Sequence, residues 1–226
     1  MTPTGVPLRV TGGRYNSSMP APPIYGLDIE TDTSVDGLDP AVAAIVTVAL
    51  SGPDGDEVFD GPEPGLLVAL DARLRSLPAG VLATWNGAAF DLPFLSDRAA
   101  HRGVALGLRL TLDRRIGSRR DPLPGHLGAY RAVWHGHRHL DAYQLYRGDV
   151  GRALQISCSL KAVARLVGYT PIEVDRARIH DLAPDALAAY VTSDARLARL
   201  LAVRRGPGAL AGCATGGPPL NVTPPR

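Results

Sequence analysis

The chain has 226 residues, of which 45% are hydrophobic and 20% charged, so it has enough apolar content for one sizeable core but not for several domains. Its formal net charge of +2 is too small to identify a nucleic-acid partner, and its two cysteines are too few for a disulfide framework or a zinc cluster. Because no signal peptide or membrane-spanning apolar run is visible, we expect a cytoplasmic protein.

The first part of the chain predicts an arm followed by an antiparallel meander. Pro, Gly and polar residues dominate residues 1–22, which we expect to be disordered, and the folded domain is expected at 23–205. The elements expected next are strands ending at Glu30, at 43–50 and at 57–59, and a helix at 64–77. The Gly-Pro-Asp-Gly turn between the second and third strands makes them antiparallel neighbours.

The rest of the domain alternates strands with helices. The expected elements are a buried strand at 81–85, a helix from 90 to about 102, a strand at 137–143, a short helix at 159–167 and a long helix at 184–205. Residues 104–136 are rich in Gly, Pro and Arg and are expected to form an insertion or long loop, and the tail at 206–226 is expected to be disordered. This order predicts an α/β fold with a mixed sheet, an antiparallel meander followed by parallel strands, flanked by helices.

Acidic residues lie on three separate elements. Asp28 and Glu30 share one face of a strand, where their charges repel each other unless a cation lies between them. Asp91 opens a helix, and Tyr190 and Asp194 share one face of the last helix. Each pattern alone is more often a solvated surface feature or a helix-terminal acid. Together, and in this order, they indicate a site for hard metal ions with oxygen ligands.

Three motifs follow one another along the chain: Asp28-x-Glu30, Asn86-Gly-x-x-Phe90-Asp91-x-Pro93 and Tyr190-x-x-x-Asp194. In order and placement they resemble the motifs of the DEDD superfamily of 3′–5′ exonucleases. The resemblance is to the tyrosine branch, DEDDy, because Ala189 stands where the other branch carries a histidine. The second motif is similar to that of the proofreading domains of family B DNA polymerases and their small stand-alone relatives. The helix around Lys161 resembles one that often precedes the last motif.

The resemblance implies a ribonuclease H-like fold in which Asp28, Glu30, Asp91 and Asp194 bind two divalent cations, Mg²⁺ or Mn²⁺. Such a pair activates a water molecule and stabilises the attacking and leaving oxygens. Tyr190 is expected to orient that water before it accepts any proton, because a phenol with a pKa of about 10 is a poor base. The expected reaction is the release of nucleoside 5′-monophosphates from the 3′ end of single-stranded DNA.

The candidate nucleic-acid contacts are Asn86, Phe90, Arg114, Arg115, Arg119 and Arg120. Similar proteins suggest that Asn86 contacts the backbone and Phe90 the terminal base or sugar, although a core role for Phe90 is equally expected. The stretch 109–138 holds many arginines and only two acids. It therefore forms either a phosphate path or an ordinary arginine-rich loop.

Four polar residues near the end of the expected strand at 137–143 have weaker signals. His135, His137 and His139 alternate as on a strand, and without further His or Cys ligands for zinc they favour a surface or nucleic-acid-facing strand. Asp141 is expected to cap the following helix, with a supporting role behind the metal site as the alternative.

Three other functions stay open at this level. An RNA 3′–5′ exonuclease similar to ribonuclease D shares the tyrosine motif, and RNA is distinguished from DNA by local contacts to the 2′-hydroxyl that a sequence does not place. A non-catalytic nucleic-acid-binding module is disfavoured by the intact acids. A ribonuclease H-type endonuclease is disfavoured by the spacing of Tyr190 and Asp194.

Overall fold

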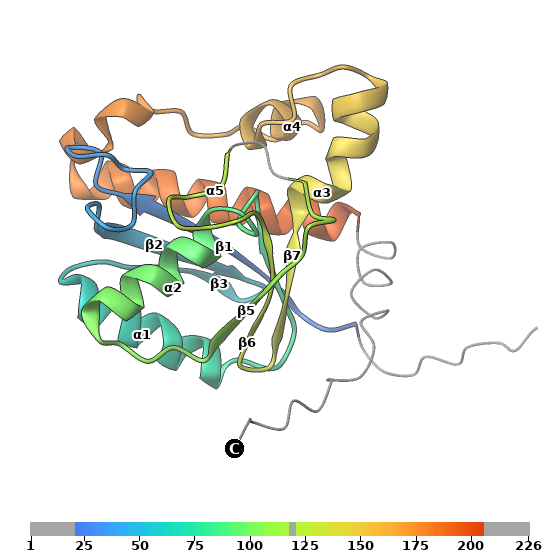
Figure 1. Cartoon of the computed structure of the whole chain (residues 1–226). Helices are drawn as coiled ribbons and strands as arrows, with labels where there is room; N and C mark the ends of the chain where they lie inside the picture. Colours follow the sequence, from blue (N-terminus) through green and yellow to red (C-terminus); the bar gives the residue numbers. More distant parts are fainter. Residues whose placement is uncertain (1–20, 118–120, 206–226) are drawn as a thin grey trace, which may run out of the picture.

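A computed structural model describes residues 21–117 and 121–205 of the chain (Figure 1). The expected tail, and all but the last two residues of the expected N-terminal arm, lie outside the described residues. Within the described ranges, no helix is both long and apolar enough to span a membrane.

A seven-stranded mixed sheet forms the centre of the fold, in the order β3-β2-β1-β4-β7-β6-β5. Its strands are β1 (Ile24–Thr31), β2 (Ile45–Gly52), β3 (Gly55–Phe59), β4 (Val81–Thr84), β5 (Leu108–Leu112), β6 (Tyr130–Trp134) and β7 (His137–Asp141). The first three strands form the antiparallel meander, and β1, β4 and β7 run parallel. The predicted α/β class with a mixed sheet is confirmed.

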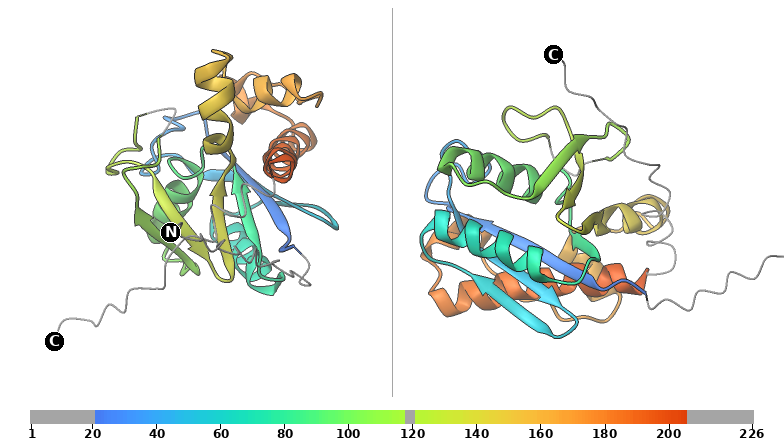
Figure 2. Two further views of the ribbon diagram at one scale, coloured as in Figure 1. Left: turned by 90° about the vertical axis from the view of Figure 1, so that its right-hand side faces the viewer. Right: turned by 90° about the horizontal axis from the view of Figure 1, so that it is seen from below.

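Helices lie on both faces of this sheet (Figure 2). They are α1 (Glu63–Ser76), α2 (Asp91–Arg102), α3 (Ala142–Tyr146), a π-helical segment η1 (Arg147–Ala153), α4 (Leu160–Leu166), a 3₁₀ helix η2 (Arg176–Asp181) and α5 (Pro184–Arg204). On one face, α1 and α2 bury residues such as Leu70 and Phe94 in the larger core. On the other, α3, α4 and α5 pack around Val81 and Leu201. Burying each such side chain contributes about 1.5–3 kcal/mol.

The alternation along β1 decides which side chains face which layer. Tyr25, Leu27 and Ile29 point into the core beneath α1 and α2. Asp28 and Glu30 therefore point to the opposite face, which is covered by α5, because successive strand residues alternate. The strand that anchors the core thus also presents two carboxylates to the helix that carries the last motif.

Residues 104–136, expected as an insertion or long loop, instead carry two strands of the sheet. β5 pairs with β6, and β6 pairs with β7, so this segment extends the sheet at its edge. Half-buried leucines alternate with an exposed arginine and an exposed threonine along β5. This alternation did not predict a strand, because the run is short and lies among Arg, Gly and Pro residues that are typical of a loop.

The strand predicted at 137–143 ends at Asp141, where α3 begins, and the expectation of an exposed strand of histidines is wrong. His137 is buried, and its Nε2 lies 2.8 Å from the carbonyl oxygen of Leu74. His139 is hydrogen-bonded to Thr84 at 2.8 Å, and burial lowers its pKa to about 3, so it is neutral. Both histidines are thus held by neighbouring elements, His137 by α1 and His139 by β4.

Candidate active site

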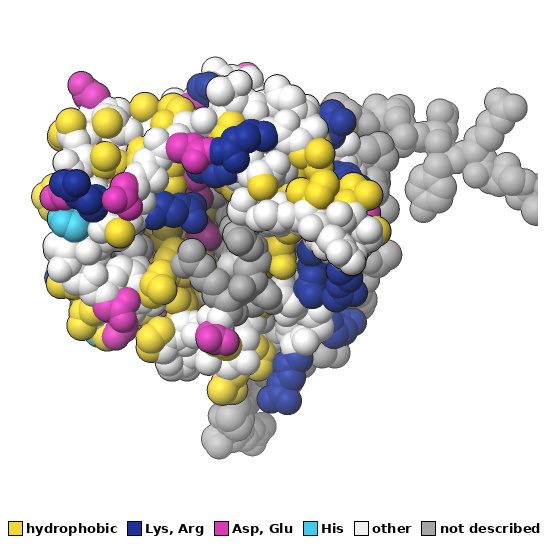
Figure 3. Space-filling view, turned by 90° about the horizontal axis from the view of Figure 1, so that it is seen from above, with side chains coloured by type: hydrophobic (Ala, Val, Ile, Leu, Met, Phe, Trp, Pro, Cys, Tyr) yellow, Lys and Arg dark blue, Asp and Glu magenta, His cyan; other side chains and the backbone are white. Residues whose placement is uncertain are grey.

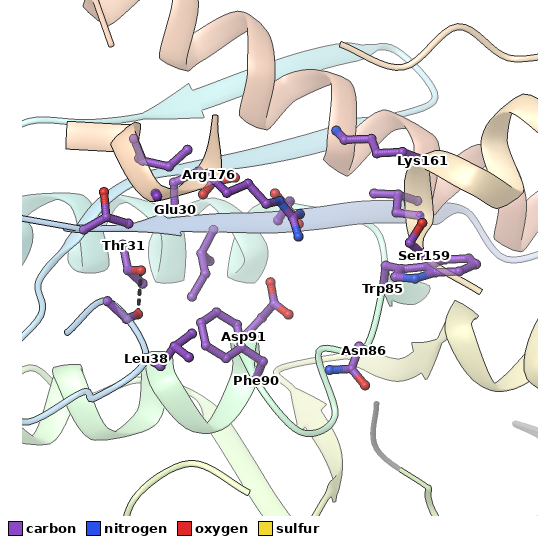
Figure 4. Close-up of a pocket in the computed structure, with 17 residues that line it drawn as sticks. Glu30, Thr31, Leu38, Trp85, Asn86, Phe90, Asp91, Ser159, Lys161 and Arg176 are labelled. Atoms are coloured by element: carbon purple, nitrogen blue, oxygen red, sulfur yellow. Dashed lines mark hydrogen bonds between the residues drawn. The ribbon is translucent and has the colours of Figure 1, made fainter. Parts of the chain in front are cut away.

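A cavity of about 380 Å³ opens at the edge of the sheet where β1 and β4 end. Its walls are the loop after β1, the turn after β4 and the segments around α4 and η2 (Figure 4). Figure 3 shows the face that carries α4 and η2, where basic and acidic side chains gather around a hollow. Asp28, Glu30 and Asp91 all line the cavity, and they belong to two of the three predicted motifs.

Three of the four predicted acids form one tight group. Single carboxylate oxygens of Asp28, Glu30 and Asp194 all lie within 4.8 Å of one another. Asp194 is 1% exposed, and its Oδ2 is buried without a hydrogen-bond partner in the described part of the chain. A buried carboxylate oxygen without a donor is costly, and a divalent cation would satisfy it. The donor set, all carboxylate oxygen, fits Mg²⁺ or Mn²⁺.

The close approach of α5 to β1 brings Asp194 to this group. A Cβ atom on Gly26 would collide with the carbonyl oxygen of Ala195, so only glycine lets the helix backbone lie directly on the strand. Asp194 precedes that contact point on the helix, and Asp28 follows Gly26 by two residues on the same face of the strand. The position of the metal-binding candidates therefore depends on a residue without a side chain.

Asp91 reaches the cavity from the turn after β4 and lies outside the 4.8 Å group. The turn requires a left-handed backbone at Asn86, with φ of 70°, which is uncommon for a residue other than glycine. Asp141 stabilises this conformation of Asn86, because the Oδ1 of Asp141 accepts a hydrogen bond from the backbone N–H of Asn86 at 2.8 Å. Asp141 also caps α3 through Tyr143 at 3.1 Å, as predicted. Its second role, in shaping the turn that positions Asp91, has no signal in the sequence.

The clustered acids resist simultaneous ionisation. Burial raises the pKa of Asp28 well above its usual range, and Glu30 and Asp91 raise it further. Burial likewise raises the pKa of Glu30 to about 7, against the opposing effect of Arg176, and that of Asp91 to about 7. Perturbed carboxylates of this kind concentrate at functional sites.

We expect the metal-free protein to lose stability as the pH rises. Glu30 and Asp91 have folded-state pKa values of about 7, above the usual values near 4, so the folded state binds more protons than the unfolded state between pH 4 and 7. The stabilisation that these two groups contribute is therefore largest below that range and falls through pH 7, by about 1 kcal/mol or more between pH 6 and 8. Thermal melts in chelator at the two pH values measure this.

Two controls accompany that measurement. Glu30→Gln should flatten the pH profile, because it removes one of the carboxylates whose pKa is raised. Mg²⁺ should stabilise the wild-type protein more at pH 8 than at pH 6, because the acids are then ionised. A melting temperature in chelator that is the same at pH 6 and pH 8 would contradict the electrostatic account.

Two cations flank the acids. Lys161, on α4, forms an ion pair with Asp194, and its Nζ lies 4.4 Å from the centre of the Tyr190 ring. Arg176, at the start of η2, donates to the Tyr190 hydroxyl at 3.0 Å. Tyr190 itself is fully buried beneath them. The sequence signal for Lys161 was the resemblance of its helix, whereas Arg176 is one of many arginines and no motif marks it.

The predicted nucleic-acid contacts divide into three groups. Asn86 and Phe90 line the cavity, and Phe90 also packs on Phe94 with ring centres 5.4 Å apart, as its core role predicts; its contact with a terminal base or sugar stays a prediction. Arg114 and Arg115 are exposed and do not line the cavity, and Arg115 pairs with Asp113 at 3.1 Å. Arg119 and Arg120 lie outside the described residues.

Known proteins resemble this chain in sequence and in structure. No family model matches the chain. The DNA polymerase epsilon catalytic subunit of Schizosaccharomyces pombe is 34% identical over 151 residues, which are 62% of this chain and 6% of that protein. One such subunit of Arabidopsis thaliana is 32% identical over 128 residues, 55% of this chain and 5% of that protein. The chain is similar in sequence to part of the DNA polymerase epsilon catalytic subunit.

The likeness to DNA polymerase epsilon is confined to a small part of that large protein, since the chain spans about 6% of the length of its curated relative. Among solved structures, the family B DNA polymerase from the hyperthermophilic archaeon Pyrobaculum calidifontis superposes with a TM-score of 0.64 and 24% identity. The superposition covers 83% of this chain and 25% of that polymerase. The structural likeness establishes the shared mixed-sheet fold.

Proposed function

We propose that this chain is a metal-dependent 3′–5′ exonuclease that hydrolyses the terminal phosphodiester bond of single-stranded DNA and releases nucleoside 5′-monophosphates. The observation that carries the proposal is the gathering of Asp28, Glu30 and Asp194 oxygens within 4.8 Å beside an open cavity. Asp91 faces the same cavity from a second element. Such an arrangement of acids costs folding free energy, which a purely structural role does not explain.

Asp28, Glu30, Asp91 and Asp194 would hold two divalent cations, Mg²⁺ or Mn²⁺. When bound, such ions lower the pKa of a water molecule and neutralise charge on the attacking and leaving oxygens. Lys161 balances part of the charge of Asp194 through their ion pair. The turn at Asn86 holds Asp91 in the cavity wall, so three of the four carboxylates, Asp28, Glu30 and Asp91, line the cavity before any ligand enters.

Tyr190 supports the reaction as a positioning group. Burial and the nearby Glu30 raise the pKa of its phenol above the ordinary value near 10, so it stays protonated at neutral pH. A protonated hydroxyl hydrogen-bonds a water molecule and orients it without removing its proton. This argues for orientation of the attacking water rather than for general base catalysis.

DNA is the proposed substrate because the relatives found by sequence are DNA polymerases by name. The cavity volume of about 380 Å³ suits a small ligand such as one terminal nucleotide. Phe90 supplies an apolar surface and Asn86 a polar one within it. Aromatic side chains bind single-stranded bases with little sequence preference.

A panel of oligonucleotides tests the proposal. Single-stranded DNA and matched RNA, both labelled at the 5′ end, are incubated with Mg²⁺, Mn²⁺ or chelator, together with a circular single strand. We expect metal-dependent shortening of the DNA from its 3′ end and an intact circle. Faster loss of RNA would favour the ribonuclease D-like alternative, and cleavage of the circle would favour an endonuclease. No cleavage and no cation binding would favour a non-catalytic module.

We propose that exposed arginines on one face of the sheet contact the part of the DNA strand that extends beyond the cavity. Val133 pairs with both Arg109 and Arg138, and Thr111 pairs with Arg131, so the three arginines share one face of β5, β6 and β7. All three are exposed, and the start of β6 lies beside the turn after β4, where the backbone N–H of Tyr130 donates to the carbonyl of Ala88. A phosphate chain leaving the cavity would cross this face.

Replacing Arg109, Arg131 and Arg138 together with Gln should weaken binding of single-stranded DNA at low salt. Removing each phosphate contact should reduce the slope of log affinity against log salt by about 0.7. Hydrolysis of a dinucleotide should be unchanged, because it does not extend beyond the cavity. Arg75→Gln, on the far α1 layer, is the matched control. An unchanged salt slope in the triple variant would leave these residues as an ordinary arginine-rich surface.

A further inference from the structure

The 3₁₀ helix η2 is held firmly at the rim of the cavity, and Arg176 is its first residue. Asp175 caps the helix by accepting a backbone hydrogen bond at 3.1 Å, and Ile179 is buried at 2% exposure. Thr33, in the loop after β1, ties η2 across the cavity wall, because its hydroxyl lies 2.8 Å from Nδ1 of His180 and accepts from the His180 backbone at 3.3 Å. The backbone position from which the Arg176 side chain extends is therefore fixed.

The Arg176 side chain crosses over β1 toward the acids (Figure 4). Its Nε donates to the Tyr190 hydroxyl at 3.0 Å, while its nearest approach to Asp194 is 3.9 Å, too long for a hydrogen bond. The side chain lines the cavity and is 60% exposed. A guanidinium has five N–H donors, and within the described ranges only the one to Tyr190 is used. The others are available to a ligand in the cavity.

The charge balance at the site favours an anionic ligand beside Arg176. The four carboxylates, fully ionised, outweigh Lys161 and Arg176 by two negative charges. Two bound divalent cations would change the net charge of the site from −2 to +2. The guanidinium of Arg176 would then lie in a site with excess positive charge. A phosphate group between the guanidinium and the cations relieves their repulsion, and guanidinium binds phosphate through paired hydrogen bonds.

We propose that Arg176 binds the phosphate of the 3′-terminal nucleotide and at the same time orients the hydroxyl of Tyr190. The inference rests on the exonuclease function proposed above and adds a substrate-binding residue to it. One N–H of the guanidinium holds the positioning group, and its remaining donors hold the phosphate on which the water acts. Arg176 thereby couples the position of the phosphate to that of Tyr190.

Binding of thymidine 5′-monophosphate in Mg²⁺, measured by calorimetry, tests this without requiring hydrolysis. We expect Arg176→Gln to raise the dissociation constant about tenfold or more, because it removes charge-assisted hydrogen bonds. Arg176→Lys should lie between Gln and wild type, because it keeps the charge but not the planar fork. Arg178→Gln is the matched control: it lies on the same helix, pairs with Asp181 and does not line the cavity. It should bind as wild type.

Two outcomes would overturn the inference. If Arg176→Gln binds thymidine 5′-monophosphate as tightly as wild type while binding Mn²⁺ more tightly, Arg176 only offsets the charge of the acids. If the wild-type protein does not bind the nucleotide at all, the cavity does not hold this phosphate. If the nucleotide binds and Arg176→Gln weakens it, but wild type degrades no oligonucleotide, only the proposed reaction fails.

A double-mutant cycle separates the orienting role from a general effect on the fold. Arg176→Gln and Tyr190→Phe should each lower kcat, and their combination should cost less than the product of the two, because both act through one hydrogen bond. Thermal melts should stay close to wild type for Arg176→Gln, because the side chain is largely exposed. Fully multiplicative effects would show that the two residues act separately.

Discussion

Asp194→Asn should lower the rate of the proposed hydrolysis by about 10³-fold or more, because it removes one charged ligand from the centre of the acidic group. The amide keeps the size of the side chain but no longer offers two anionic oxygens. The stabilisation of the protein by Mn²⁺ in thermal melts should fall with the activity, since both depend on the same ligand. Degradation of a labelled single strand and melts with and without Mn²⁺ are the two measurements.

Asp185→Asn is the control for that substitution. Asp185 is exposed in the first turn of the same helix, so the variant changes the charge of α5 without touching the cavity. It should retain both activity and Mn²⁺ stabilisation. Full activity of Asp194→Asn in Mg²⁺ would show that the acidic group does not carry the reaction, and would contradict the proposed two-metal site.

Gly26→Ala should destabilise the protein by about 3 kcal/mol, at the upper end of the usual cost of overpacking. The new methyl group would collide with the carbonyl oxygen of Ala195 and lie 2.8 Å from Cβ of Arg199. Neither obstacle is the mobile end of a side chain, so α5 must move away from β1. Because α5 carries Tyr190 and Asp194, activity should fall in the molecules that still fold. Urea unfolding gives the free energy.

Gly65→Ala, on α1, is expected to have the opposite effect on stability. No atom lies within 4 Å of the position where its Cβ would be, and alanine favours a helix interior, so stability should rise by about 0.5–1 kcal/mol. A Gly26→Ala protein with the unfolding free energy of wild type would show that α5 can shift at little cost. The alignment of Asp194 with Asp28 would then need another explanation.

The elements that carry the candidate site could be predicted because each follows from a local pattern. The apolar run before Asp28 became β1, the helix opening at Asp91 became α2, and the long helix near the C-terminus became α5. The edge strand β5 and its neighbour β6 were not predicted, because one face of each carries exposed residues, with arginines among them, between the apolar ones. Edge strands contain less apolar sequence than central ones.

The residues that complete the cavity were less predictable. Asp141 was predicted to cap a helix, which it does, but its hydrogen bond to Asn86 joins the end of β7 to the turn after β4 and depends on the register of these two strands. Arg176 lies in a short 3₁₀ helix whose position depends on Thr33 from a distant loop. Contacts of this kind have no periodicity in the sequence.

Periodicity alone determined two pairings at this site. Asp28 and Glu30 share a face because a strand repeats every two residues, and Tyr190 and Asp194 share a face because a helix repeats every 3.6. Only the tertiary structure decided that the two faces meet, because their approach depends on the absence of a side chain at Gly26 and on the packing of α5. It also decided that Arg176 and Lys161 lie beside the acids, since residues far apart in the chain come together only when the elements that carry them pack against each other.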